Sequence, residues 1–393
     1  MNIEQKKVMV IGGGIAGLTV AWELSKAGIH VELVEKTCFL GGYAIGFTCK
    51  ASDKCLQCGA CSVESMLKNV VNEPLINVHL VTEIKSVKDG DGFSVVLQKS
   101  KFSVPENYDK KVVKGHSKNN DPLYVIINKE KNTDNLDGAV LLETLGTNGT
   151  VHVDAVLVAN GFKPFDAHTK ATYGYDKFNN VITGLELEEI LRENGNIFRP
   201  SDGKIPQKIA FIQCVGSRDE RLGNLWCSQI CCPYALRCAQ SIKYKNPDSD
   251  ITIFYMDIQN VGKDFPVFYE QCKSDFKFVR TIPVDVYPIE NDRLRIRHLN
   301  EAEGVATLEE FDLLVLSIGI TPATDNDILS KQLNITLDKD GFFAESNNIT
   351  GSSASKQGVF IAGTCHGPKS IAASMAHSEQ AVYEVMKYLE EGK

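Results

Sequence analysis

Long hydrophobic runs are absent from this sequence. A membrane-spanning helix needs about 20 consecutive apolar residues, whereas the apolar runs here, such as 155–159 and 312–318, have the length of a strand. Residues 1–7 pass directly into Val8-Met9-Val10-Ile11, without the apolar stretch and small-residue cleavage site of a secretory signal. We therefore predict a cytoplasmic protein with no direct membrane span.

An excess of positive charge is also absent. Lys and Arg number 42 against 50 Asp and Glu, which gives a net charge of −8, so nucleic acid is not an expected partner. With 31 Gly and 13 Pro the chain is neither collagen-like nor of low complexity. At 393 residues it is long enough for two or three domains with hydrophobic cores.

Cysteine is abundant, although a reducing compartment argues against a disulfide framework. Of the 12 cysteines, eight form two tight groups. The first group is Cys49, Cys55, Cys58 and Cys61, and the second is Cys214, Cys227, Cys231 and Cys232. Two groups of four thiols indicate metal binding.

A glycine-rich turn lies between a predicted strand and a predicted helix near the N-terminus. The run 8–11 leads into Gly12, Gly14 and Gly17, which form a G-x-G-x-x-G motif, and a second strand ends at Glu35. Glycines at this spacing let the backbone approach a pyrophosphate at the helix N-terminus, and Glu35 supplies acceptors for ribose hydroxyls. We predict a dinucleotide site here rather than a turn without a ligand.

Three further segments favour FAD as the dinucleotide. Gly41 and Gly42, which follow Glu35 by six and seven residues, resemble the extended signature of two-dinucleotide-binding flavoproteins. The strand 154–159 ends in a turn where these proteins usually have Ala-Thr-Gly, and 358–365 resembles the turn that meets the flavin ribityl chain. Many relatives have Asp at position 364, so here an acidic contact must come from elsewhere or from backbone N–H groups. The predicted FAD-binding residues are Gly12, Gly14, Gly17, Glu35, Lys36, Gly41, Gly42, Asn160, Gly161, Gly363, Thr364 and Lys369.

His366 and Lys369 bracket Gly367-Pro368 before a helix predicted from Ala372 to Glu391. A cation or helix N-terminus there would lie by the flavin pyrimidine ring and stabilise the negative charge of the reduced flavin. Both residues are therefore candidate catalytic residues. The alternatives are a turn histidine and a solvated lysine at a helix start.

The middle of the chain departs from a nicotinamide-binding domain. Residues 208–212 predict a strand, but Cys214 follows where phosphate-cradling glycines would be expected. We infer a domain that has lost its nucleotide and taken up another redox centre.

Four thiols suit an iron–sulfur cluster, and we predict one 4Fe-4S cluster bound by Cys214, Cys227, Cys231 and Cys232. The adjacent Cys231 and Cys232 require an irregular or helix-start backbone, because neighbouring side chains diverge. A zinc site or buried free thiols are the alternatives.

The earlier group contains Cys-Leu-Gln-Cys-Gly-Ala-Cys, which resembles the three-ligand run of bacterial ferredoxins. We predict a second 4Fe-4S cluster bound by Cys55, Cys58 and Cys61 with Cys49 as fourth ligand. Cys38 is a spare thiol or a substitute ligand.

The segment 211–219 resembles the A subunit of heterodisulfide reductase, as do 173–175, 180–183, 252–258 and 367–371. The resemblance implies an oxidoreductase with FAD and iron–sulfur clusters that passes electrons within a larger assembly. We expect a homodimer docked with other heterodisulfide-reductase-like subunits that carry iron–sulfur clusters. The compact form, with its insert at 49–55, looks most like the A subunit of the soluble heterodisulfide-reductase-like complex of sulfur oxidisers.

These patterns predict an α/β protein with a thioredoxin-reductase-like two-dinucleotide-binding flavoprotein fold. Residues 1–165 form the first part of an FAD domain with the cysteine insert at 49–61, and residues 166–310 form a second Rossmann-like domain. Residues 311–393 complete the FAD domain, with the strand 312–319 as the return segment.

Four functions remain open on the sequence. The leading one is an electron-transfer subunit in sulfur-compound oxidation. The others are the A subunit of a quinone-interacting or electron-bifurcating heterodisulfide reductase complex, a stand-alone pyridine nucleotide-disulfide oxidoreductase, and a flavin-bearing scaffold whose cysteines hold zinc. The missing second glycine motif counts against the third.

Overall fold

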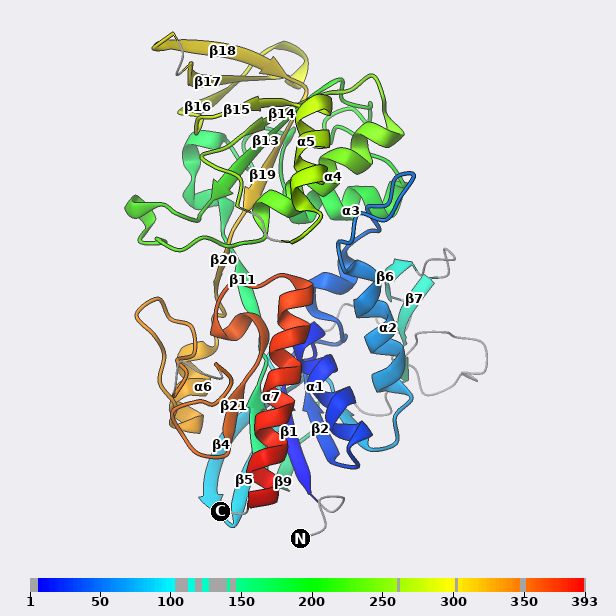
Figure 1. The fold of residues 1–393 in the computed structure, drawn as a ribbon, viewed down its shortest axis with the longest axis vertical. Helices are drawn as coiled ribbons and strands as arrows, with labels where there is room; N and C mark the ends of the chain where they lie inside the picture. Colours follow the sequence, from blue (N-terminus) through cyan, green and yellow to red (C-terminus); the bar gives the residue numbers. More distant parts are fainter. Residues whose placement is uncertain are drawn as a thin grey trace. The chain divides into compact units, whose positions relative to one another are not determined.

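The chain divides into two compact units. The computed structural model describes residues 6–102, 112–116, 122–126, 140–141, 146–259, 262–300, 303–346 and 351–391 (Figure 1). Unit 1 comprises Met1–Phe47, Gly59–Lys163 and Pro322–Lys393, and unit 2 comprises Thr48–Cys58 and Pro164–Thr321. The chain changes unit around the segment Thr48–Cys58, and again at two short strands that pair with each other, β11 (Phe162–Pro164) and β20 (Ile320–Pro322).

Unit 1 is built on a five-stranded sheet in which every pair is parallel. The strands, in spatial order, are β21 (Val359–Ile361), β10 (Ala155–Val158), β1 (Lys7–Ile11), β2 (His30–Val34) and β3 (Ile76–His79). The helices are α1 (Ile15–Lys26), α2 (Ala60–Val71), α6 (Asn326–Leu333) and α7 (Ile371–Glu391). The final helix therefore begins one residue before the predicted position.

Both faces of this sheet are buried, which explains why its strands read as continuous apolar runs. Val8 and Val10 of β1 face a core shared with α1, α2 and α7, whereas Met9 and Ile11 face a second core with α6. Successive side chains of a strand point to opposite faces, so one short run serves both cores. Figure 1 shows α1 and α7 side by side on the first of these faces.

Two smaller sheets interrupt unit 1 between β3 and β10. One is antiparallel and consists of β4 (Thr82–Gly90), β5 (Gly92–Lys99) and β9 (Gly149–Val153). The other consists of β6 (Val112–His116), β7 (Pro122–Ile126) and β8 (Val140–Leu141). The apolar alternation at 93–97 and 123–127 predicts two strands of one antiparallel segment, but these residues fall in different sheets, and Ile127 lies outside the described residues. The polar stretch 99–122 predicts a solvated hairpin or loop, and most of it also lies outside the described residues.

Unit 2 repeats this architecture with a second parallel sheet. Its strands, in spatial order, are β12 (Val181–Thr183), β19 (Leu313–Ile318), β13 (Lys208–Val215), β14 (Asp250–Phe254) and β15 (Lys277–Val279). Its helices are α3 (Gly184–Asn194), α4 (Cys231–Lys245) and α5 (Phe265–Asp275). An antiparallel sheet is formed by β16 (Asp285–Pro288), β17 (Leu294–Asn300) and β18 (Val305–Phe311).

Short 3₁₀ helices join these elements. They are η2 (Gly42–Gly46), η3 (Ala167–Thr169), η4 (Ala171–Tyr173), η5 (Glu220–Leu222), η6 (Glu290–Asp292) and η7 (Gly363–His366).

The strand at 313–318 differs from its predicted place. It was expected to return the chain to the FAD domain, but β19 pairs with β12 and β13 inside unit 2. A continuous apolar run fits any parallel sheet that is covered on both faces, so its composition does not identify its sheet. After β19 the chain returns to unit 1 at Pro322.

Across the described part of the chain, no helix has the length and apolar character needed to cross a bilayer.

Candidate dinucleotide and thiol sites

The glycine turn after β1 leaves no room for side chains at two of its three motif positions. Gly12 has φ +107°, and a Cβ there would lie 2.4 Å from the carbonyl oxygen of Ala159. A Cβ on Gly17 would lie 1.8 Å from the carbonyl oxygen of Gly12. These two glycines therefore set the backbone of the turn and its packing against β10.

Gly14 has a different role, because it faces open space. It is the N-cap of α1 with φ −74°, and no side chain caps the helix or places an acid in its first turn. A Cβ built on Gly14 meets nothing within 4 Å. The helix N-terminus thus presents backbone N–H groups and a positive dipole end to an uncrowded space, which fits a pyrophosphate.

Glu35 and the glycine pair after it close this turn. Glu35 accepts hydrogen bonds from the N–H groups of Gly13 and Thr37, both at 2.8 Å, and its carboxylate keeps lone pairs for further donors. The Gly41 N–H donates to the Gly13 carbonyl at 2.7 Å, and a Cβ on Gly42 would lie 3.2 Å from the Gly14 Cα. The structure therefore brings the predicted extended signature onto the glycine turn.

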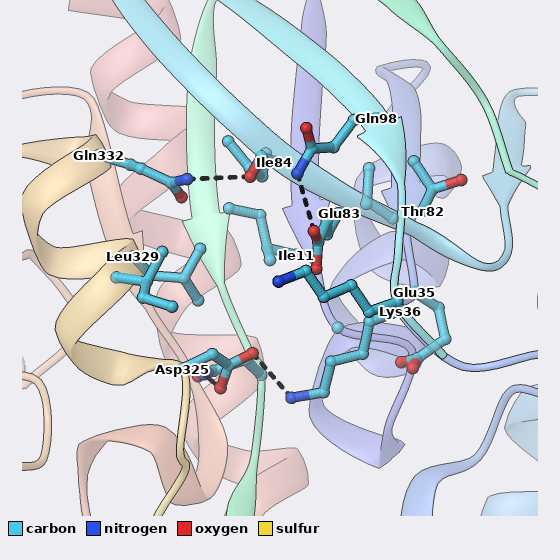
Figure 2. Close-up of a pocket in the computed structure, with 15 residues that line it drawn as sticks. Ile11, Glu35, Lys36, Thr82, Glu83, Ile84, Gln98, Asp325, Leu329 and Gln332 are labelled. Carbon is cyan, nitrogen blue, oxygen red and sulfur yellow. Dashed lines mark hydrogen bonds and ion pairs between the residues drawn. The ribbon is translucent and has the colours of Figure 1, made fainter. Parts of the chain in front are cut away.

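A cavity of about 270 Å³ opens beside Gly12, Glu35 and Lys36. In Figure 2 the Lys36 ammonium and the Asp325 carboxylate point toward each other, and they form an ion pair at 2.7 Å. Asn160 donates to Asp325 at 2.9 Å, while its own side-chain oxygen is buried without a hydrogen-bond partner. An unpaired buried acceptor beside the glycine turn fits a site built for a polar ligand.

The C-terminal turn predicted to meet the flavin packs on the start of α1. Gly363 has φ +76°, and a Cβ there would lie 2.5 Å from the Cβ of Ala16. Thr364 follows in η7, and its hydroxyl oxygen lies 4.0 Å from where a Cβ on Gly161 would stand. The structure thus gathers the predicted residues of three distant segments around the N-terminus of α1.

His366 and Lys369 contact each other next to this turn. Lys369 Nζ lies 3.0 Å from His366 Nδ1, and His366 Nε2 lies 3.3 Å from the Glu345 carboxylate. Burial, followed by the Lys369 charge, lowers the pKa of His366 to about 4. Burial also lowers the pKa of Lys369. At neutral pH the His366 imidazole that lies between Lys369 and the Glu345 carboxylate is therefore neutral.

His377 of α7 is a residue that the sequence did not single out. Its Nδ1 accepts the N–H of Gly363 at 3.0 Å, and its Nε2 lies 2.7 Å from the Gly351 carbonyl, so the proton resides on Nε2. Burial lowers the pKa of His377 to about 4. A neutral histidine thus fixes the backbone of the predicted flavin turn.

The second cysteine group forms a cluster in unit 2 at the carboxyl end of β13. Cys214, Cys231 and Cys232 are buried together against Met256 and Ile258. α4 begins at Cys231, in agreement with the helix start expected for two adjacent ligands. The thiols therefore occupy the helix N-terminus that would hold phosphate in a nucleotide-binding Rossmann unit.

Hydrogen bonds among these thiols centre on Cys231. The S–H groups of Cys214 and Cys232 favour a thiolate at Cys231 and so lower its pKa well below the usual value. Cys227 lies near Cys231, and burial raises the pKa of Cys227. Among the described residues no three His, Cys, Asp or Glu side chains have the arrangement of a ready-made metal site. The donor set of four cysteine sulfurs nevertheless fits the thiolate preference of an iron–sulfur cluster.

The first cysteine group is not brought together in one unit. Cys49, Cys55 and Cys58 belong to unit 2, whereas Cys61 lies in unit 1 on the first turn of α2. Cys49, Cys55 and Cys61 are exposed and Cys58 is half-buried.

A buried ion pair fixes the segment Thr48–Cys58 to the rest of unit 2. Lys50 Nζ donates to the Glu188 carboxylate of α3, and each side chain is 2% exposed. The N–H and hydroxyl of Thr48 donate to the same carboxylate at 2.9 and 2.7 Å. Arg237 of α4 donates to the Leu56 carbonyl at 2.7 Å. No local sequence motif predicts these contacts, because their partners are distant in the chain.

Known structures establish the fold. The chain has the thioredoxin-reductase-like two-dinucleotide-binding flavoprotein fold, as the sequence predicted. Thioredoxin reductase of T. acidophilum superposes with a TM-score of 0.57 at 13% identity, covering 98% of this chain and 99% of that one. Thioredoxin reductase of Lactococcus lactis gives 0.56 at 14% identity, covering 99% and 100%. Residues 10–55 match the family described as NAD(P)-binding Rossmann-like domain.

Sequence relatives are subunits of heterodisulfide reductases. The chain is 33% identical to the iron-sulfur A subunit of CoB--CoM heterodisulfide reductase from Methanocaldococcus jannaschii, over 99% of this chain and 65% of the relative. It is 30% identical to the A subunit of H(2):CoB-CoM heterodisulfide,ferredoxin reductase from Methanothermobacter thermautotrophicus, over 95% of this chain and 62% of the relative. The chain therefore spans less than two thirds of the length of these relatives.

Proposed function

We propose that this chain is the FAD- and iron–sulfur-containing electron-transfer subunit of a heterodisulfide-reductase-like complex that oxidises sulfur compounds. The observation that carries the proposal is the thiol cluster at the N-terminus of α4. A nicotinamide-dependent flavoprotein needs that helix end for phosphate, whereas four cysteines there suit single-electron transfer. The similarity to heterodisulfide reductase subunits supports the same assignment.

In this proposal, unit 1 binds FAD and unit 2 binds an iron–sulfur cluster. In unit 1, Gly14 leaves space for the FAD pyrophosphate, and Asn160 offers an acceptor without a partner. In unit 2, Cys214, Cys227, Cys231 and Cys232 would hold a 4Fe-4S cluster. When bound, FAD exchanges electrons in pairs and an iron–sulfur cluster exchanges them one at a time. Lys369 contacts His366 beside the predicted flavin turn, and His377 accepts the N–H of Gly363 within that turn.

The first cysteine group belongs to the proposal as a second 4Fe-4S site, held by Cys49, Cys55, Cys58 and Cys61. The partners would be other cluster-bearing subunits of the complex, with which a homodimer of this chain docks. Oxidation of a sulfur compound needs sites for the substrate and for the final acceptor, and the thiol clusters connect such sites rather than provide them.

A second candidate is the A subunit of an electron-bifurcating heterodisulfide reductase. The Methanothermobacter relative has both a heterodisulfide and a ferredoxin in its name, which favours this candidate. The two candidates share the cofactors and differ in the acceptors that their complexes reduce.

The test is anaerobic purification of the chain, followed by titration with NADH and NADPH. We expect a flavin spectrum that neither nucleotide bleaches, with iron and acid-labile sulfide present. Stoichiometric bleaching by either nucleotide in a protein without iron would contradict the proposal and favour a pyridine nucleotide-disulfide oxidoreductase.

A further inference from the structure

An ion pair lies directly beside the thiol cluster of unit 2. Arg218, four residues after Cys214, donates through its guanidinium to the carboxylate of Asp257, which follows β14. The backbone carbonyl of Asp257 lies 3.8 Å from the sulfur of Cys232 and accepts its S–H. Asp257 therefore contacts the thiol cluster through its backbone carbonyl, and it contacts Arg218 through its side-chain carboxylate.

The backbone of Arg218 is fixed as well. Its N–H donates to the carbonyl of Trp226, the residue before Cys227, at 3.1 Å. Arg218 has φ +54°, a backbone conformation that residues other than glycine seldom adopt. The backbone of Arg218 thus bridges the loop that joins Cys214 to Cys227. Both the backbone N–H and the guanidinium of Arg218 have hydrogen-bond partners.

The charge of Arg218 reaches the sulfurs. It interacts electrostatically with both Cys214 and Cys227, and the opposite charge of Asp257 also acts at Cys227. Two further cations lie beside this segment: Arg280 donates to the Met256 carbonyl at 3.2 Å and acts on Asp257, and Lys170 pairs with Asp219. Since Arg218 and Asp257 are only 30% and 39% exposed, water screens them incompletely.

An anionic group bound by four thiolates becomes more negative when it accepts an electron. A fixed cation nearby stabilises the reduced state more than the oxidised state, and a fixed anion does the reverse. We propose that Arg218 raises the reduction potential of the group held by Cys214, Cys227, Cys231 and Cys232, and that Asp257 offsets part of this effect. This inference rests on the proposed function, because it needs a redox group at these cysteines.

The experiment is a potentiometric titration of the anaerobically purified full chain, followed by low-temperature electron paramagnetic resonance, with iron determined for each variant. Arg218→Gln removes the cation, Arg218→Lys keeps it, and Asp257→Asn removes the anion. Arg221→Gln is the matched control, since it makes the same charge change on an exposed residue of the same loop. We expect a lower midpoint potential in R218Q and a higher one in D257N, with R218K and R221Q close to the unmodified protein.

Equal potentials in R218Q and R221Q would overturn the inference, and so would shifts of the same sign in R218Q and D257N. If R218Q does not retain iron, the decision passes to D257N, and a potential in D257N that is unchanged or lower overturns the inference. An unmodified chain without iron overturns the proposed function itself. That outcome is distinct from an iron-containing protein with insensitive potentials.

Discussion

Gly14→Ala separates binding of a dinucleotide from folding of the glycine turn. The new methyl group meets nothing within 4 Å in the protein, and φ −74° at Gly14 is ordinary for alanine. Alanine loses less backbone entropy on folding but is a poorer N-cap residue than glycine, so the two effects oppose each other and we expect a stability within about 1 kcal/mol of the unmodified chain.

Flavin binding, in contrast, should weaken. The methyl group would occupy the space through which a pyrophosphate reaches the N–H groups at the start of α1. A hydrogen bond to a charged group contributes about 1.5–3 kcal/mol, so the loss of two such bonds weakens FAD binding by roughly 10²- to 10⁴-fold.

The assay is FAD binding to deflavinated protein by fluorescence quenching, together with thermal unfolding of the FAD-free form. Gly90→Ala is the matched control, because a Cβ at Gly90 also meets nothing within 4 Å but lies at the β4–β5 turn. Undiminished FAD affinity in G14A would refute the reasoning and move the dinucleotide elsewhere. A large loss of stability in FAD-free G14A would refute it too, since the turn would then be sensitive for structural reasons.

Three further outcomes follow from buried groups. Lys50→Met leaves Glu188 buried without its cation and should lower the free energy of unfolding by about 3–5 kcal/mol. In denaturant titrations the double variant with Glu188→Met should recover most of this free energy, and no recovery would contradict the pairing. Ser228→Ala removes the buried acceptor of the Ile320 N–H, which should speed exchange of that amide hydrogen, and an unchanged rate would show that the contact contributes nothing. The pKa values of His366 and His377 fall from 6.5 to about 4 on folding. The unfolded chain therefore binds more protons between these pH values, so the free energy of unfolding should fall as pH drops from 6.5 to 4. Replacing both histidines with Gln should make the free energy of unfolding less dependent on pH in this range, and an unchanged dependence would show that neither histidine is buried in its neutral form.

The glycine turn could be predicted because its determinants are local. Gly12, Gly14 and Gly17 lie within six residues of one another, and the strand and helix on either side have their own apolar patterns. The contact among the thiols of Cys214, Cys231 and Cys232 was also expected, since the fold returns the end of β13 to the start of α4.

Long-range contacts could not be predicted in this way. Asp325 pairs with Lys36 from 289 positions away, and no feature of its own segment indicates that it lies beside the predicted dinucleotide site. His377 lies on α7, and the helical pattern around it does not indicate that its ring contacts Gly363 and Gly351. The predicted return strand, 313–318, was placed in the wrong sheet because its apolar composition suits both parallel sheets.

The central claim is that four cysteines of unit 2 hold an iron–sulfur cluster, and iron analysis of Cys232→Ala tests it most directly. The comparison uses anaerobically purified unmodified protein, with FAD content measured in both samples. We predict about eight iron atoms in the unmodified chain and about four in the variant, with the reduced paramagnetic signal of one cluster missing and FAD retained in unit 1. Equal iron content and an unchanged signal in the two proteins would contradict the account and leave Cys232 a buried thiol.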